Sequence, residues 1–159
     1  MRSTIYELST NPVPVHQRIS PGYLPDWFFS SICDYATKMS TTEREESIAM
    51  LVAHFRDLCI RNGDQLRFSP LLKQHYFKES YEYFMETAKA LSETNYDIFA
   101  GITPAPAFQT ALHNFMESYA DKHSFYVYEA EKLIPLDCWI RSADISKIFY
   151  IGGTIHYYY

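Results

Sequence analysis

The apolar residues of the chain follow a helical period in its middle third. Between residues 43 and 61 they recur every three or four positions, so they fall on one face of a helix. Thr42 and Glu45 have the spacing of a capping box, in which each side chain satisfies a free backbone amide at the other residue. The pattern therefore predicts a helix over 43–61, ending near Gly63.

Two further helices are predicted by a shared start signal. Ser69-Pro70 and Thr103-Pro104 each place a capping residue before a proline, which is tolerated in the first helical turn. These signals predict helices over 70–91 and 104–120. In the second of these helices, the residues at helical spacing form the expected core stripe: Phe108, Ala111, Leu112, Phe115, Met116 and Tyr119.

After residue 123 the pattern changes to short runs of aromatic and branched residues, which favour strands. Gly152-Gly153 separates two of these runs and predicts a hairpin turn. The alternation over residues 4–8 predicts an N-terminal strand that can join the same sheet. We expect an α+β protein whose three main helices pack on a mostly antiparallel C-terminal sheet. The expected C-terminal strands are 125–128, 133–134, 138–140, 148–151 and 154–159.

Composition narrows the class of protein without identifying an activity. The 159 residues are 47% hydrophobic and 21% charged, which is typical of one folded domain spanning 1–159. A net charge of −5 argues against a protein that coats nucleic acid, because such proteins present a basic face. The unusual feature is the aromatic content, which is 17% and includes 14 tyrosines.

The N-terminal region and the cysteines favour a cytoplasmic protein. Residues 1–30 hold several prolines and lack the long apolar run of a signal peptide. No apolar stretch reaches the roughly 18 residues of a transmembrane helix. Cys33, Cys59 and Cys138 are odd in number and widely spaced, which favours free thiols over a disulfide framework.

Two arrangements would support an enzyme. Cys138 would act as a nucleophile if the fold brought His123 or His156 beside it as a base. His113 and Glu117 are one helical turn apart and would supply part of a metal site, although one helix cannot supply every ligand. Free cysteines are most often buried, however, and a polar helix face is most often solvated. The chain also lacks nucleotide- and phosphate-binding motifs, so we expect no metal, no cofactor and no catalytic role.

The expected helix over 70–91 has a wide apolar arc. Its charged residues occupy one narrow sector, and the rest of its surface is apolar or aromatic, roughly twice the width of an ordinary core-facing stripe. Two explanations stay open. Either the helix is central and covered on both flanks, or part of the arc is exposed and binds a partner. Tyrosine is enriched in contact surfaces, which supports the second explanation.

This helix supplies a candidate partner-binding surface. Three glutamates spaced three and four apart form an acidic ridge, and aromatic residues lie beside it. Carboxylates can pair with the Arg and Lys of a basic partner, and aromatic rings can replace stacked bases. The alternative is an ordinary solvated face. The candidate residues are Tyr76, Phe77, Glu79, Glu82, Tyr83 and Glu86.

We therefore expect a non-catalytic module that binds a protein with a basic surface. A more specific hypothesis is an accessory protein of a phage or mobile element that inhibits or modulates a host nucleic-acid-processing enzyme. Direct nucleic-acid binding is less favoured because carboxylates balance the cations near the β-rich end, and no membrane contact is expected. The alternatives are a small enzyme that uses Cys138 or the His113/Glu117 pair, and a homo-oligomer that pairs through an exposed C-terminal strand ending at Tyr159.

Overall fold

The computed structural model describes residues 1–159, which divide into two compact units. One unit combines Met1–Lys73 with Lys122–Tyr159 and contains the whole β-sheet; we call it the sheet unit. The other unit is Gln74–Asp121, which is helical; we call it the helical hairpin. This division concerns packing, and a single domain over 1–159 stays a prediction.

The sheet unit is built on seven strands in one sheet. The strands are β1 (Arg2–Ser9), β2 (Tyr35–Lys38), β3 (Cys59–Asn62), β4 (Gln65–Phe68), β5 (Tyr126–Glu129), β6 (Lys132–Pro135) and β7 (Phe149–Tyr158). Their order is β3-β4-β7-β1-β5-β6, and β2 also pairs with β7. The β1–β5 pair is parallel and the other pairs are antiparallel. The predicted α+β class, the mostly antiparallel sheet and the joining of the N-terminal strand are therefore confirmed.

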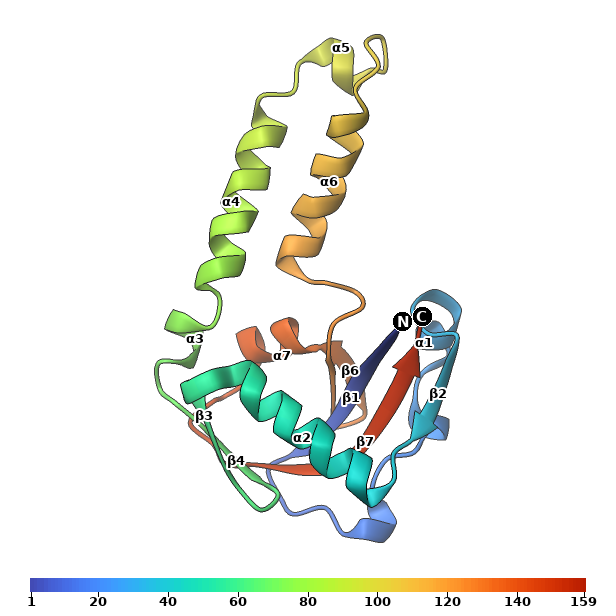
Figure 1. Ribbon diagram of the computed structural model, residues 1–159, viewed down its shortest axis with the longest axis vertical. Helices are drawn as coiled ribbons and strands as arrows, with labels where there is room; N and C mark the ends of the chain where they lie inside the picture. The colour runs from blue at the N-terminus through green and yellow to red at the C-terminus, as the bar shows by residue number, and fades with distance from the viewer. The chain divides into compact units, whose positions relative to one another are not determined.

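Three helices cover the two faces of this sheet. They are α1 (Asp26–Ser31), α2 (Thr41–Phe55) and α7 (Leu136–Ser142). Neighbouring strand residues point to opposite faces, so Ile5 and Tyr6 mark the two sides of β1. Phe28 of α1 belongs to the buried cluster that contains Ile5. On the other side, the Tyr6 hydroxyl donates a hydrogen bond to the Ser47 carbonyl of α2 at 2.8 Å. Figure 1 shows α2 crossing the near face of the sheet.

Aromatic side chains supply much of the core of the sheet unit. The ring of Phe28 packs edge-to-face on Tyr126 and Tyr157, with centroids 5.1 Å and 5.2 Å away. Trp139 of α7 is fully buried and packs edge-on against Phe149 of β7 at 5.0 Å. Such pairs add to the stabilisation that comes from burying their large apolar surfaces. Part of the high aromatic content is therefore explained by packing.

The C-terminal end is one long strand rather than a hairpin. β7 runs through Gly152 and Gly153 without turning, so the predicted turn is wrong. A Cβ atom on Gly152 would overlap Glu7 Oε2, and one on Gly153 would lie 3.0 Å from backbone atoms of Ile19. The Glu7 carboxylate accepts hydrogen bonds from the Gly153 amide at 2.6 Å and the Ile19 amide at 3.0 Å. The two glycines therefore leave room for a carboxylate that joins three segments of the chain.

The end of β7 is not a free sheet edge. Tyr158 lies opposite Arg2 of β1 on one side and opposite Tyr35 of β2 on the other. The hypothesis of pairing between copies through this strand assumed an exposed edge. That assumption is wrong, because both sides of the strand are already paired within the chain.

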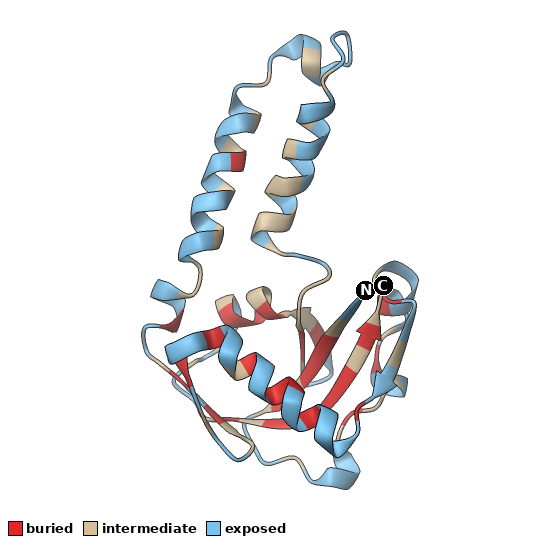
Figure 2. Cartoon of the chain, viewed as in Figure 1, coloured by how far each residue is buried: buried red, intermediate tan, exposed pale blue.

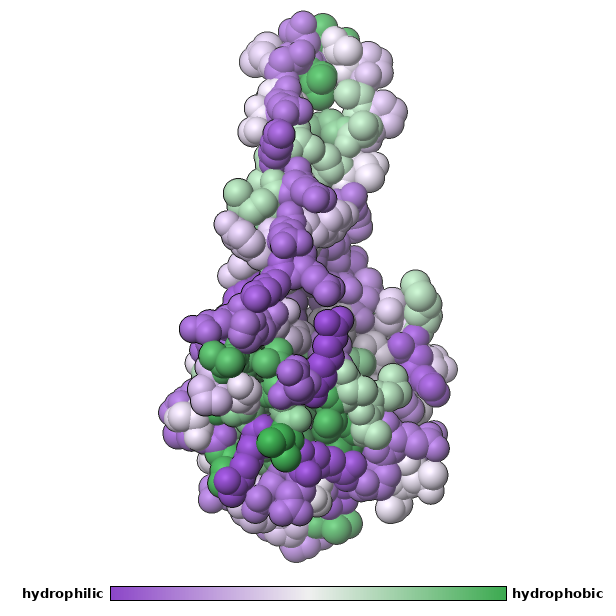
Figure 3. All heavy atoms as spheres, turned by 60° about the vertical axis from the view of Figure 1, so that its left-hand side comes forward, coloured by the Kyte–Doolittle hydropathy of each residue, from purple (hydrophilic) through white to green (hydrophobic).

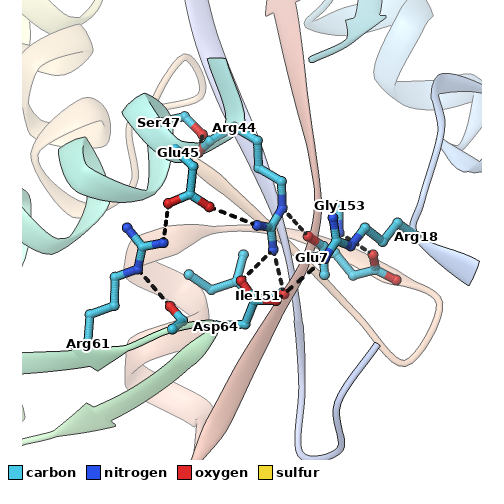
Figure 4. Close-up of polar contacts among 11 residues, drawn as sticks. Glu7, Arg18, Arg44, Glu45, Ser47, Arg61, Asp64, Ile151 and Gly153 are labelled. Atoms are coloured by element: carbon cyan, nitrogen blue, oxygen red, sulfur yellow. Dashed lines mark hydrogen bonds and ion pairs between the residues drawn. The ribbon is translucent and has the colours of Figure 1, made fainter. Parts of the chain in front are cut away.

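A buried arginine joins α2 to the sheet beside the two glycines (Figure 4). Arg44 Nε donates to the Gly152 carbonyl, and Nη2 donates to the Ile151 carbonyl and to Asp64 Oδ1, each at 2.9 Å. Asp64 also pairs with Arg18 at 3.4 Å. A buried charge is costly unless it is paired and hydrogen-bonded, so these contacts make the position of α2 specific.

The limits of α2 differ from the predicted 43–61. The capping box is formed by Ser40 and Glu43, which exchange hydrogen bonds between side chain and backbone, so the helix begins two residues early. It ends before Arg56, whose φ of 56° is incompatible with a continuing helix. Residues 59–62 form β3 instead of a last helical turn.

The predicted strand over 138–140 is also wrong. Cys138 and its neighbours belong to α7, which begins directly after Pro135. Three consecutive apolar residues fit a buried strand and a buried helical turn equally well. Here Trp139 and Ile140 belong to a helix, and both of their side chains are buried.

The helical hairpin has two long helices joined through a short one (Figure 1). They are α4 (Lys78–Ser92), α5 (Tyr96–Phe99) and α6 (Pro106–Tyr119). The helix predicted over 70–91 is divided, because α3 (Leu72–His75) ends before Tyr76 and α4 begins after Phe77. The helix predicted over 104–120 corresponds to α6. No helix of the chain has the length and apolarity required to cross a bilayer.

We predict that Gly152→Ala destabilises the protein by about 1–3 kcal/mol, the usual cost of overpacking a tight site. The new methyl group would displace the Glu7 carboxylate and break its hydrogen bonds to the Gly153 and Ile19 amides. Urea unfolding monitored by tryptophan fluorescence measures this change. Gly22→Ala is the matched control, since a Cβ atom there meets nothing within 4 Å. Equal stabilities for the two variants would contradict the proposed role of Gly152.

We also predict that His156 makes the protein less stable as the pH falls below about 6.5. Burial, and next the positive charge of Arg2, lower the pKa of His156. The unfolded chain therefore binds the proton first, so stability is full above pH 6.5 and is lost as the pH falls toward the folded-state pKa. Thermal unfolding between pH 7 and pH 5 should show a weaker pH dependence for His156→Gln than for the unchanged protein. An unchanged slope would argue against this assignment.

Candidate functional site

The helical hairpin is held together by a narrow seam between α4 and α6. The rings of Phe84 and Phe115 stack across it, with centroids 4.7 Å apart. The seam residues recur at steps of three and four, as in an antiparallel coiled coil. On α4 and α6 they are Ser80, Phe84, Thr87, Leu91, Phe108, Ala111, Phe115 and Ser118, all buried or half-buried. Thr87, which is 7% exposed, is the only buried residue of the hairpin. In Figure 2 the two long helices of the hairpin are accordingly almost entirely in the colours of exposed and half-buried residues.

One side of this seam carries a second, uncovered set of apolar residues. Each member follows a seam residue by one position, so each is rotated from the seam in the same sense. Because α4 and α6 run antiparallel, the same rotation brings both stripes to the same side of the hairpin. We call this set the apolar face; it comprises Tyr81, Met85, Ala88, Leu112, Met116 and Tyr119.

The apolar face is open to solvent. The exposed fractions are 64% for Met116, 61% for Tyr81 and 48% for Met85. Phe84 and Phe115 set the level of the two helices, which places Met85 beside Met116 and Tyr81 beside Tyr119. Aligned apolar residues at this exposure on two neighbouring helices form a continuous patch, and such patches mark interaction sites more often than isolated exposed residues do.

A shallow hollow of about 760 Å³ lies along α4 at the edge of the apolar face. Tyr81, Met85 and Ala88 form its apolar part. Glu82, Glu86 and Lys89 form its charged border. The hollow therefore combines an apolar floor with a charged rim in which carboxylates outnumber the one lysine.

The helical hairpin carries all of the net charge of the chain. Between Gln74 and Asp121 there are two lysines and seven Asp or Glu residues, which give a net charge of −5. The whole chain has 14 basic and 19 acidic residues, so the sheet unit is left with 12 of each and is formally neutral. In Figure 3 a hydrophilic band runs up the hairpin. The exposed charged residues of α4 are Lys78, Glu79, Glu82, Glu86 and Lys89, and Glu93 follows directly after the helix.

The residues predicted as a partner-binding surface lie on several sides of the hairpin. Glu79 and Tyr83 each precede a seam residue, so they lie on the flank opposite the apolar face, and both are exposed. Glu82 and Glu86 are exposed on the outer side of α4, where they line the hollow. Tyr76 and Phe77 precede α4; both are half-buried, and their rings contact each other edge-on at 4.8 Å.

The wide apolar arc on the expected third helix is partly exposed: Tyr81, Tyr83 and Met85 face solvent, whereas Leu72 is buried and the remaining members are half-buried. α4 packs against α6 on one flank, and its other aromatic residues face solvent, with Tyr83 45% exposed. Within the hairpin, this arrangement favours the second explanation, an exposed part of the arc. The acidic ridge of Glu79, Glu82 and Glu86 is present on the surface, and its binding of a partner stays a prediction.

The predicted core stripe of α6 is only partly correct. Phe108, Ala111 and Phe115 face the seam, whereas Leu112 and Met116 are exposed. An amphipathic pattern identifies residues that avoid water, but it does not identify what covers them. The apolar face was missed for this reason, and its sequence signal is the excess width of the arc.

The residues of the two enzyme hypotheses are not brought together into a catalytic arrangement. Cys138 lies in α7, and no hydrogen bond joins its thiol to a histidine. His113 is exposed and Glu117 half-buried on α6. No group of three or more His, Cys, Asp and Glu side chains is placed so that it could hold a metal ion.

Comparison with protein-family models, with curated protein sequences and with solved structures found no match.

We predict that Cys138 is alkylated before the other two thiols, at a rate no higher than that of a free cysteine. Burial raises the pKa of Cys33, and it raises that of Cys59 to about 11, so both hold their protons and are shielded from reagent. Cys138 is half-buried, and no hydrogen bond joins its thiol to a histidine. Iodoacetamide labelling at pH 7, followed by mass spectrometry of peptides, measures the three rates. Labelling of Cys138 well above the rate of N-acetylcysteine would instead support the nucleophile hypothesis.

Proposed function

We propose that the protein is a non-catalytic binding module whose helical hairpin contacts a protein with a basic surface. The observation that carries this proposal is the separation of charge. The hairpin holds a net charge of −5 together with exposed aromatic residues, while the sheet unit is neutral. A charge concentrated on one element steers and orients a partner of opposite charge, which a scattered charge does not do.

The exposed side of α4 fits a basic partner in its chemistry. Glu79, Glu82 and Glu86 are exposed at steps of three and four residues and so share one side of the helix. Tyr83 lies beside them with 45% of its surface exposed. Carboxylates accept charge-assisted hydrogen bonds from Arg and Lys, and a tyrosine supplies a large contact surface at a low entropic cost.

The more specific form of the proposal is an accessory protein of a phage or mobile element that acts in the cytoplasm on a host nucleic-acid-processing enzyme. Enzymes of this class bind phosphates through Arg and Lys and stack bases on aromatic or planar side chains. A helix that presents carboxylates and rings together offers both kinds of contact. The hairpin would then inhibit or modulate the enzyme by occupying its nucleic-acid groove.

Site-specific photo-crosslinking tests the proposal. Benzoylphenylalanine replaces Tyr83 in one version of the full chain and Tyr23, which is 63% exposed in the sheet unit, in the matched control. We expect position 83, and not position 23, to crosslink a discrete protein in a host lysate. The combined Glu79→Gln, Glu82→Gln and Glu86→Gln change should reduce that product about tenfold if the contact is electrostatic.

The inhibitor hypothesis adds a second measurement. The captured protein should be an enzyme acting on nucleic acid, and the unchanged chain should inhibit its activity more strongly than the triple Gln variant does. Identical products from positions 83 and 23, or no product from either, would refute binding through the hairpin. If the captured enzyme is not inhibited, the proposal of a binding module stands and the hypothesis of an inhibitor is refuted.

A further inference from the structure

We infer that the apolar face of the hairpin is a docking site for one amphipathic helix of a partner protein, with an apolar stripe and basic flanks. This inference rests on the proposed function, since it names the kind of partner element that the hairpin takes. It concerns the flank opposite Glu79 and Tyr83, and residues that the sequence pattern had placed in the core.

The shape of the face suits a helix. The two stripes run along α4 and α6 for about two turns, with Tyr81 level with Tyr119 and Met85 level with Met116. A third helix laid over the seam would bury both stripes at once, which is the ordinary way in which an apolar stripe is covered in a helical bundle. Methionines adapt their shape and are common on surfaces that receive helices.

The charge around the face selects a basic helix. Glu82 and Glu86 border the hollow, with Lys89 as the opposing charge. The hairpin as a whole has a net charge of −5. Lysines or arginines on the flanks of a docked helix would pair with these carboxylates at the rim, where they add specificity and speed of association.

A second copy of the same face is a poorer occupant. Two hairpins packed face to face would bring together two surfaces that each have a net charge of −5. The pair would have fourteen carboxylates and only four lysines to offset them. Like charges at an interface are costly and suppress that pairing. The apolar residues would be buried equally well by either partner, so charge decides between them.

The experiment uses the full chain and two labelled model peptides of about 18 residues, or roughly five helical turns. Both have leucines on one face; one has lysines on the other face and one has glutamates. Fluorescence anisotropy should show binding of the lysine peptide and none of the glutamate peptide. The affinity should fall when NaCl is raised from about 50 mM to about 500 mM, because the rim contacts are screened.

Charge-matched variants locate the contact. Met85→Glu and Met116→Glu place a carboxylate on the apolar face, and Ala90→Glu and Ala107→Glu place one on the opposite flank of the same helices. All four positions are exposed, so the fold should persist, which circular dichroism checks. We expect Met85→Glu and Met116→Glu to reduce the affinity for the lysine peptide about tenfold or more, which is the range of interface hot spots. The other two should change its affinity by no more than about twofold.

Met85→Glu and Met116→Glu would lower the affinity for the lysine peptide even though each adds a negative charge, which by itself favours binding of a basic peptide. Equal binding of the two peptides, no binding of either, or an equal effect of all four variants would overturn the inference. A dimer in light scattering that Met116→Glu dissociates would show that a second copy occupies the face instead. If position 83 still crosslinks a partner while the lysine peptide fails to bind, the proposed function stands and the basic-helix occupant is wrong.

Discussion

The sheet unit depends on the way β7 passes Gly152 and Gly153. Because these positions have no side chains, the Glu7 carboxylate can accept hydrogen bonds from the Gly153 and Ile19 amides. The carbonyls of Ile151 and Gly152 accept hydrogen bonds from Arg44. Carboxylate and guanidinium thus approach the same strand segment, and each is satisfied there. A strand with ordinary residues would exclude the first contact, and an unpaired buried arginine would be costly. This joint positions β1, β7 and α2 together, and the rest of the core follows from their alignment.

The sequence predicted the class of the fold because helical and strand periods are local properties. It failed where a local signal had a tertiary cause. Gly152-Gly153 has the composition of a turn, yet the requirement for glycine comes from Glu7, which is distant in the sequence. The run containing Cys138 and Trp139 has strand-like composition but is too short to show a period, and it packs as the helix α7. In both places the deciding contact involves a residue that no local window contains.

The candidate site shows the same division. The acidic ridge of α4 could be read directly, since Glu79, Glu82 and Glu86 share a helical face wherever the helix lies. The apolar face could not, because Leu112 and Met116 have the spacing of core residues and only the fold shows that nothing covers them. The excess width of the apolar arc was the available signal. Width indicates that more apolar surface exists than one neighbouring helix can bury, and it leaves the identity of the cover open.

The energetics of the helical hairpin connect its exposure to its proposed role. Two helices of 15 and 14 residues are marginal in isolation, and Thr87 is the only buried residue of this pair. Its order therefore rests on the Phe84–Phe115 seam and on the chain connections at both ends. A partner that covered Met85 and Met116 would supply the buried area that the pair lacks, so binding would also stabilise the helices. An element of low intrinsic stability is a common choice for a binding surface, because the partner's contact energy then orders the element as well as holding the complex. The same reasoning explains why the net negative charge and a continuous exposed apolar face occur together on the hairpin, while the sheet unit is formally neutral.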